Sequence, residues 1–184
     1  MGLTGPALYR YFADRDALLA ELVVDAYADL ADALEAAVEE QRDGRPADRF
    51  RTFAAAYRAW AISQPHRYRL LFGAPIPGFA AHSERIVAAA QRSMDTLLTI
   101  LVDLDPPSAA GAARRPVGQD RQLNAWATRV GADGAATAAL WTAVLTWSRL
   151  HGVISLEIGG NFAPMGIDAA SLYDSEIDEL LKGP

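Results

Sequence analysis

The sequence predicts an all-α protein, and three observations support this prediction. Alanine makes up roughly a fifth of the chain, well above ordinary usage, while β-branched residues are sparse and seldom alternate with polar ones. Nearly all the positive charge is arginine, since Lys182 is the single lysine, and both alanine and arginine are strong helix formers. Apolar residues recur at helical spacing along most of the 184 residues. We therefore expect about eight helices and no sheet.

The first two predicted helices begin at capping residues. Thr4 can accept a hydrogen bond from an early amide, and Pro6 is tolerated in a first turn, so a short helix is expected here. Asp14 caps a second helix, which ends before the Gly-Arg-Pro sequence at 44–46. One face of this second helix is acidic, and we expect it to be solvated. The apolar stripe on its other face is predicted to contain Leu18, Leu22, Ala26, Leu30 and Leu34.

Three further helices are expected in the middle of the chain. The first spans about 47–63, and Pro65 begins a short helix that ends at the Gly- and Pro-rich sequence 73–78. The third spans about 80–102 and is predicted to bury Val87 among other apolar residues.

A loop and three helices are expected in the C-terminal part. Residues 103–118 are rich in Pro, Gly, Ala and Ser without periodicity, and we interpret them as a mobile loop. Helical patterns then cover about 121–130 and 135–158, and Asp168 caps a last helix. The apolar residues expected along 135–158 are Trp141, Leu145, Trp147, Leu150, His151, Ile154 and Ile158.

Composition and motifs exclude several classes of protein. The absence of cysteine excludes disulfides, thiolate metal sites and a thiol nucleophile. His66, His82 and His151 do not have metal-ligand spacing, and the sequence contains no phosphate-binding glycine loop, nucleophile elbow or HExxH motif. We therefore expect no metal, no cofactor and no catalytic residue, and an enzyme is the least favoured function.

Charge and hydropathy narrow the possible partners. A net charge of −6 and a pI near 5.0 argue against general nucleic-acid binding, although a local DNA-reading element is compatible with them. No apolar run approaches the length of a membrane span, and the N-terminus lacks the basic-then-apolar order of a signal peptide. We expect a soluble, cytoplasmic protein with no membrane partner.

Two segments resemble the TetR family of transcriptional regulators. The sequence LTGPALYRYFADRDALL at 3–19 resembles the recognition helix of that family, the turn after it and the start of the fourth helix. The aromatic cluster at 8–12 and the turn Asp14-Arg15-Asp16 carry this match. The sequence WSRLHGVISLE at 147–157 is similar to the Trp-His-Gly signature of one class of TetR-type C-terminal ligand-binding domains.

The resemblance implies two domains. Residues 1–41 would be the remnant of a helix-turn-helix DNA-binding domain with its linker helix, and residues 46–184 a ligand-binding and dimerisation domain. The family has two more helices before the recognition helix, where this sequence has only Met1 and Gly2. We therefore expect an N-terminally truncated chain, with tight operator binding a property of the full-length protein.

The same resemblance implies a set of DNA-contacting residues. The front of the recognition helix would enter the groove, while hydroxyl and guanidinium donors suit phosphate oxygens. The alternative makes Tyr9 and Tyr11 packing residues of a surface helix. The implied DNA-binding residues are Thr4, Gly5, Pro6, Ala7, Tyr9, Arg10, Tyr11 and Arg15.

Aromatic residues could line a ligand pocket inside the bundle, because such pockets are mostly apolar. Core packing is the alternative, and His151 could be a hydrogen-bonded core histidine. Glu157 needs a partner if buried, and Arg49, Arg51 or Arg58 of the third predicted helix could supply it. The candidate ligand-binding residues are Tyr57, Trp60, Tyr68, Phe72, Trp126, Trp147 and His151.

The favoured function is a ligand-responsive repressor that binds operator DNA as a homodimer and responds to a hydrophobic small molecule. The alternative is a small-molecule-binding or dimerisation module without DNA activity. The two C-terminal helices are expected to form the dimer, with Ser148 and Gly152 allowing close approach and with Ile177 and Leu181 in the seam.

Overall fold

The chain folds into a bundle of helices. The computed structural model describes residues 14–79, 83–104, 118–130, 132 and 136–182. Within these residues there are seven α-helices, one 3-10 turn and no strand, which confirms the all-α prediction. The elements are α2 (Arg15–Glu39), α3 (Pro46–Ser63), α4 (Pro65–Phe72), α5 (Glu84–Leu104), α7 (Gln119–Val130), α8 (Thr137–Ile158), the 3-10 turn η1 (Ala163–Met165) and α9 (Ala169–Leu181). Most of the loop predicted at 103–118 lies outside the described residues.

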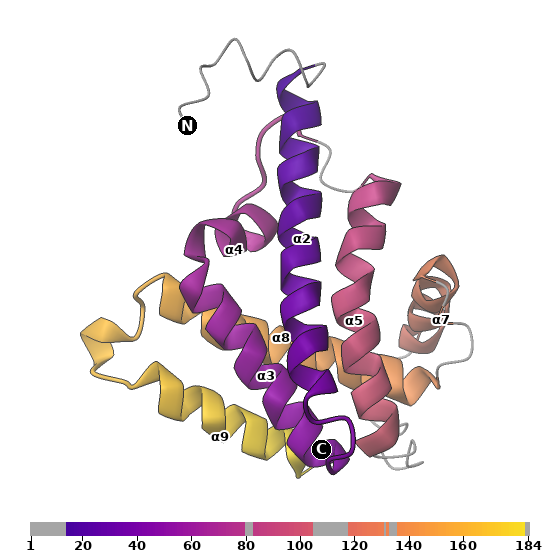
Figure 1. Cartoon of the computed structure of the whole chain (residues 1–184), viewed down its shortest axis with the longest axis vertical. Coiled ribbons are helices and arrows are strands. Elements are labelled where there is room, and N and C mark those ends of the chain that lie inside the picture. Colours follow the sequence, from indigo (N-terminus) through magenta and orange to yellow (C-terminus); the bar gives the residue numbers. More distant parts are fainter. Residues whose placement is uncertain (1–13, 80–82, 105–117, 131, 133–135, 183–184) are drawn as a thin grey trace.

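Helix α2 is the central element of the bundle. It packs against α5, α3 and α4, while α8 packs against α5, α9, α7 and α3. Figure 1 shows α2 and α5 upright beside each other, with α8 crossing behind them at a steep angle. The largest fully buried side chains lie where these helices meet, and they are Leu34, Phe50, Leu97, Ile100, Leu140, Thr146, Leu150, Ile154 and Tyr173.

The helix starts follow the capping residues that the sequence predicts. Asp14 Oδ1 accepts a hydrogen bond from the Ala17 amide at 2.8 Å, at the start of α2. The Asp168 carboxylate accepts bonds from the first amides of α9 at 3.2 Å. Pro46 and Pro65 occupy the first turns of α3 and α4, where the missing N–H would have no helical partner. Local chemistry therefore sets these boundaries.

Some predicted core positions are wrong, and helix geometry explains the errors. Leu22 is 46% exposed while its neighbour Val23 is 4% exposed, and Val87 is 42% exposed while Ile86 is buried. One residue turns a helix by about 100°, so a neighbour can take the buried place. Leu145 is 40% exposed for another reason: α8 is apolar on nearly all sides, and its own chain covers only part of it.

Candidate functional site

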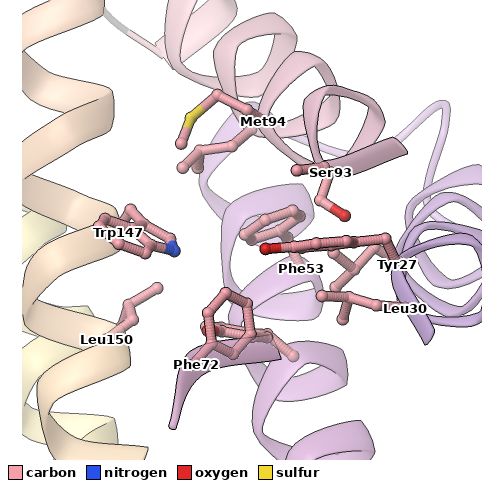
Figure 2. A pocket seen from close by; sticks show the side chains of 12 residues that line it. Tyr27, Leu30, Phe53, Phe72, Ser93, Met94, Trp147 and Leu150 are labelled. Atoms are coloured by element: carbon pink, nitrogen blue, oxygen red, sulfur yellow. The ribbon is translucent and has the colours of Figure 1, made fainter. Parts of the chain in front are cut away.

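A cavity of about 150 Å³ lies among α2, α3, α4, α5 and α8. Its lining is almost entirely apolar, which is typical of small-molecule sites. Figure 2 shows side chains from these helices pointing toward one another around the open space. The lining residues are Tyr27, Leu30, Leu34, Phe53, Tyr57, Phe72, Ala90, Ser93, Met94, Leu97, Trp147 and Leu150.

The backbone places these side chains by simple rules. On α2 and α5 the lining residues recur at spacings of three and four positions, with Ser93 and Met94 adjacent, and such residues share one helix face. Phe72 reaches the cavity as the last residue of α4, which ends at Gly73. A Cβ atom at Gly73 would come within 2.3 Å of the Arg69 carbonyl oxygen, so glycine permits this tight helix end.

Five of the seven predicted ligand-binding residues gather at this site. Tyr57, Phe72 and Trp147 line the cavity, and Tyr68 and His151 lie beside that wall. The His151 ring is stacked on Trp147, with centroids 5.1 Å apart and an interplanar angle of 19°. It is also stacked on Tyr68 at 5.6 Å and contacts Phe72 edge-on at 4.9 Å.

Two predicted residues, Trp60 and Trp126, do not line the cavity. The Trp60 indole is buried and its Nε1 donates a hydrogen bond to Asp29 Oδ2 at 2.8 Å, which ties α3 to α2. Trp126 lies on α7 and packs against the edge of the core. An aromatic residue at helical spacing can anchor one helix on another as readily as it can line a pocket, and sequence alone does not separate the two roles.

A hydrogen-bonded cluster surrounds His151. Its Nδ1 lies 2.9 Å from the Tyr68 hydroxyl and 3.3 Å from the Tyr57 hydroxyl, and its Nε2 lies 3.2 Å from Ser155 Oγ. The hydroxyls of Tyr68 and Ser155 are 2.8 Å apart. These roles depend on the tautomer: with the proton on Nε2, Nδ1 accepts from a tyrosine hydroxyl and Nε2 donates to Ser155 Oγ.

Burial keeps this cluster uncharged near neutral pH. It lowers the pKa of His151 below its ordinary value because the charged imidazolium is poorly solvated there. Burial also raises the pKa of Tyr68 and, more strongly, that of Tyr57. The cavity wall is therefore backed by neutral, hydrogen-bonding groups.

Glu157 has the partner that the sequence predicted for it. Arg58 donates two hydrogen bonds to its carboxylate, at 2.8 Å from Nε and 2.5 Å from Nη2. This part-buried pair joins α3 to α8, and the Arg58 guanidinium also lies 5.9 Å from the centroid of the Tyr173 ring on α9. The other two candidate arginines pair elsewhere, Arg49 with Asp103 and Arg51 with Asp178.

The acidic face of α2 is partly paired and not simply solvated. Arginines from α4 and α5 reach across to its carboxylates and form ion pairs between α2 and both helices. The pairs are Arg67–Asp29, Arg85–Glu21, Arg92–Asp32 and Arg92–Glu35.

The sequence analysis missed the cavity walls on α2 and α5. Tyr27, Ser93 and Met94 were not candidates because α2 was interpreted as a linker and α5 as ordinary core. The available signal was Tyr27, an amphipathic aromatic residue three positions before the buried Leu30 on a helix with an otherwise aliphatic inner face.

The prediction for Ile177 on α9 needs correction. Ile177 is 4% exposed and belongs to the core of its own chain, so it is not available to a seam between two copies. A Cβ added at Gly152 on α8 would meet no atom within 4 Å, and the predicted close approach of a second copy at this glycine stays a prediction.

Most of the predicted DNA-binding residues lie outside the described residues, namely Thr4, Gly5, Pro6, Ala7, Tyr9, Arg10 and Tyr11. Arg15 is the first residue of α2 and is exposed. Among the described residues, no group of three or more acidic or histidine side chains is arranged to hold a metal ion. None of the described helices is long and apolar enough to span a membrane.

Comparison with known proteins identifies the family. Residues 50–180 match the model of the tetracyclin repressor-like C-terminal domain. The chain belongs to the TetR family. The HTH-type transcriptional regulators Rv1816 of Mycobacterium tuberculosis and Mb1846 of Mycobacterium bovis are each 31% identical to this TetR-family chain over 182 residues. Each alignment covers 96% of this chain and 76% of the relative.

Solved structures agree with this assignment. A crystal structure described as that of a candidate regulatory protein, SCO4313, is 40% identical, with a TM-score of 0.78, and the match covers 100% of this chain and 81% of that one. A protein of unknown function from Rhodococcus sp. RHA1 is 26% identical with a TM-score of 0.67, covering 99% of this chain and 79% of that one. This TetR-family chain is therefore assigned to transcription regulation and not to catalysis.

Proposed function

We propose that this TetR-family protein is a ligand-responsive repressor that, at full length, binds operator DNA as a homodimer. The observation that carries the proposal is that α2 forms one wall of the cavity, while the predicted recognition segment directly precedes α2. A compound in the cavity would contact Tyr27 on α2 and Met94 on α5 together. A ligand that fits the cavity in only one position of α2 would favour that position. It would thereby also favour one position of the predicted recognition segment, which precedes α2.

The ligand response follows from differential binding. An effector shifts the balance between DNA-competent and ligand-bound arrangements only as far as its affinities for the two differ. The pairs of α2 with Arg85 and Arg92 on α5 are exposed, and exposed ion pairs are weak. Small movements of α2 against α5 therefore meet little electrostatic resistance.

The proposed dimer uses the outer face of α8. Leu145 and Leu156 are 40% and 46% exposed there, and Ser148 and Gly152 lie between them on the same face. The open space at Gly152 would let a second α8 approach closely. In a two-fold dimer the same patch of each copy packs against the other, so the patch must be self-complementary. Such a dimer would also place two recognition helices at the spacing of the half-sites of a palindromic operator.

The dimer can be tested on the chain itself. We expect wild-type protein to sediment as a dimer at micromolar concentration, and the double variant Leu145→Glu/Leu156→Glu to sediment as a monomer with unchanged helical circular dichroism. Ile62→Glu is the matched control, because Ile62 on α3 is 42% exposed, and we expect it to remain dimeric. A monomeric wild-type protein would remove this interface from the proposal.

DNA binding is tested with the reading frame upstream of Met1. If it encodes two amphipathic helices, we expect the extended protein to bind DNA from near its own gene and to release it when a cavity ligand is added. An extended protein that binds no such DNA would favour the alternative, a small-molecule-binding module without DNA activity.

A further inference from the structure

Three polar side chains lie at the cavity without a hydrogen-bond partner among the described residues. Ser93 Oγ is buried and unpaired. Neither the Tyr27 hydroxyl nor Trp147 Nε1 makes a hydrogen bond to any residue in the described part of the chain. Figure 2 shows the Tyr27 hydroxyl and the Trp147 indole nitrogen directed toward each other across the open space. Buried polar groups are normally paired, so the unpaired Ser93 Oγ points to a polar group that the cavity would receive. Tyr27 is half-buried and Trp147 is 38% exposed, and both offer a further hydrogen-bond donor at the cavity.

Tyr27 and Trp147 can act as hydrogen-bond donors, so a ligand between them needs a hydrogen-bond acceptor. The indole N–H can only donate. Burial raises the pKa of Tyr27, so its hydroxyl keeps its proton and can donate as well. A ligand that satisfies both groups must therefore carry an oxygen or nitrogen with a free lone pair near the middle of the cavity.

Charge and volume restrict the ligand further. None of the 12 lining residues is acidic or basic, so a charged ligand would be buried without a counter-ion, at high cost. The volume of about 150 Å³ equals that of an engineered protein cavity that accommodates benzene. The space accepts a single ring with a small substituent.

We propose that the ligand of this cavity is a small, neutral, single-ring compound that bears a hydrogen-bond acceptor, which Tyr27 and Trp147 hold between them. This inference rests on the proposal that the cavity is the effector site. Ser93 supplies a third polar group, a hydroxyl, on the α5 side of the same cavity. The paired cluster around His151 lies beside the wall and leaves these donors to the ligand.

Three probes of the same ring size test the inference by calorimetry at neutral pH. Acetophenone is neutral and carries a carbonyl acceptor, ethylbenzene has nearly the same shape without an acceptor, and benzoate is an anion. We expect acetophenone to bind about tenfold more tightly than ethylbenzene, as one or two added hydrogen bonds would give. Benzoate is expected to bind at least about 100-fold more weakly than acetophenone.

Variants of the chain assign the effect to the cavity. Tyr27→Phe and Trp147→Phe each remove one donor, and we expect each to reduce the preference for acetophenone over ethylbenzene several-fold. Trp126→Phe is the matched control, because Trp126 does not line the cavity, and the preference should stay unchanged. Ala90→Phe fills the cavity and should abolish binding of both neutral probes.

The outcomes separate this inference from the proposed function. Equal binding of ethylbenzene, tight binding of benzoate, or no binding of any probe would overturn the ligand class. The effector site itself would stand if a larger compound released the DNA complex of the extended protein and Ala90→Phe blocked that release. Acetophenone binding with the expected preference but without any effect on DNA would support the ligand class and contradict the regulatory role.

Discussion

Two groups of polar side chains, one beside the wall of the cavity and one at the cavity itself, differ in whether their hydrogen bonds are made. On one side His151, Tyr68 and Ser155 bond to one another within 3.2 Å. On the cavity side, Tyr27 and Trp147 have no partner among the described residues, and Ser93 Oγ is buried without one. The same kinds of group are therefore satisfied by the fold in one place and left unsatisfied by it in the other.

The paired group of side chains stabilises the fold, whereas the unpaired group at the cavity is able to bind a ligand. A buried hydroxyl that is hydrogen-bonded contributes to the fold, and its removal leaves its partners unpaired. A buried hydroxyl that is left unpaired lowers the stability of the fold and keeps its hydrogen bond for a ligand. Tyr57 links the two groups, because its ring lines the cavity while its hydroxyl lies 3.3 Å from His151 Nδ1.

The largest expected effect comes from removing the centre of the paired cluster. His151→Leu keeps an apolar side chain of similar bulk but leaves the Tyr68, Tyr57 and Ser155 hydroxyls short of a partner. We expect the free energy of unfolding to fall by about 2–3 kcal/mol, measured by urea denaturation. His66→Leu, at an exposed histidine, should change it by less than about 0.5 kcal/mol. Equal effects would contradict the assigned role of the cluster.

A smaller effect is expected from pH. Because burial lowers the pKa of His151 in the folded state, the unfolded chain takes up the proton first as pH falls below the ordinary value of 6.5. The stability that depends on neutral His151 is therefore complete above pH 6.5 and is lost as pH falls through the folded-state pKa.

The measurement is the difference in free energy of unfolding between wild type and His151→Gln, followed as pH falls from about 8 to about 5. The glutamine variant keeps a polar side chain that does not titrate, so other groups cancel in the difference. We expect the wild type to lose its advantage on acidification. An advantage that grew toward low pH would show that the folded state favours the charged imidazolium.

The helix caps and the need for a partner at Glu157 were largely predictable from sequence. Helix starts at Asp14 and Asp168 depend on residues within three positions, so a local pattern identifies them. The sequence could predict that Glu157 requires a partner, because a carboxylate in an apolar stretch needs a hydrogen-bond donor, and that an arginine of α3 could be this donor. The choice of Arg58 depended on how α3 and α8 cross, which no local pattern contains.

The cavity was less predictable, because it depends on where five helices fail to fill the space between them. Trp60 and Trp147 both carry an indole at helical spacing, yet Trp60 donates to Asp29 and Trp147 faces the cavity. Tyr27 and Ser93 were missed for the same reason, since their neighbours across the cavity are distant in sequence. The predicted DNA contacts and the division at residues 41–46 stay predictions.

The smallest expected effect is at Ser93, and Ser155 provides a matched comparison because both serines are half-buried. Ser93→Ala removes a buried hydroxyl without a partner, so the free energy of unfolding should stay within about 0.5 kcal/mol of wild type or rise slightly. Ser155→Ala removes a hydroxyl that bonds Tyr68 at 2.8 Å and His151 at 3.2 Å, and should cost about 1 kcal/mol. If Ser93→Ala instead costs as much as Ser155→Ala, the Ser93 hydroxyl has a partner in solution and the cavity offers one donor fewer to its ligand.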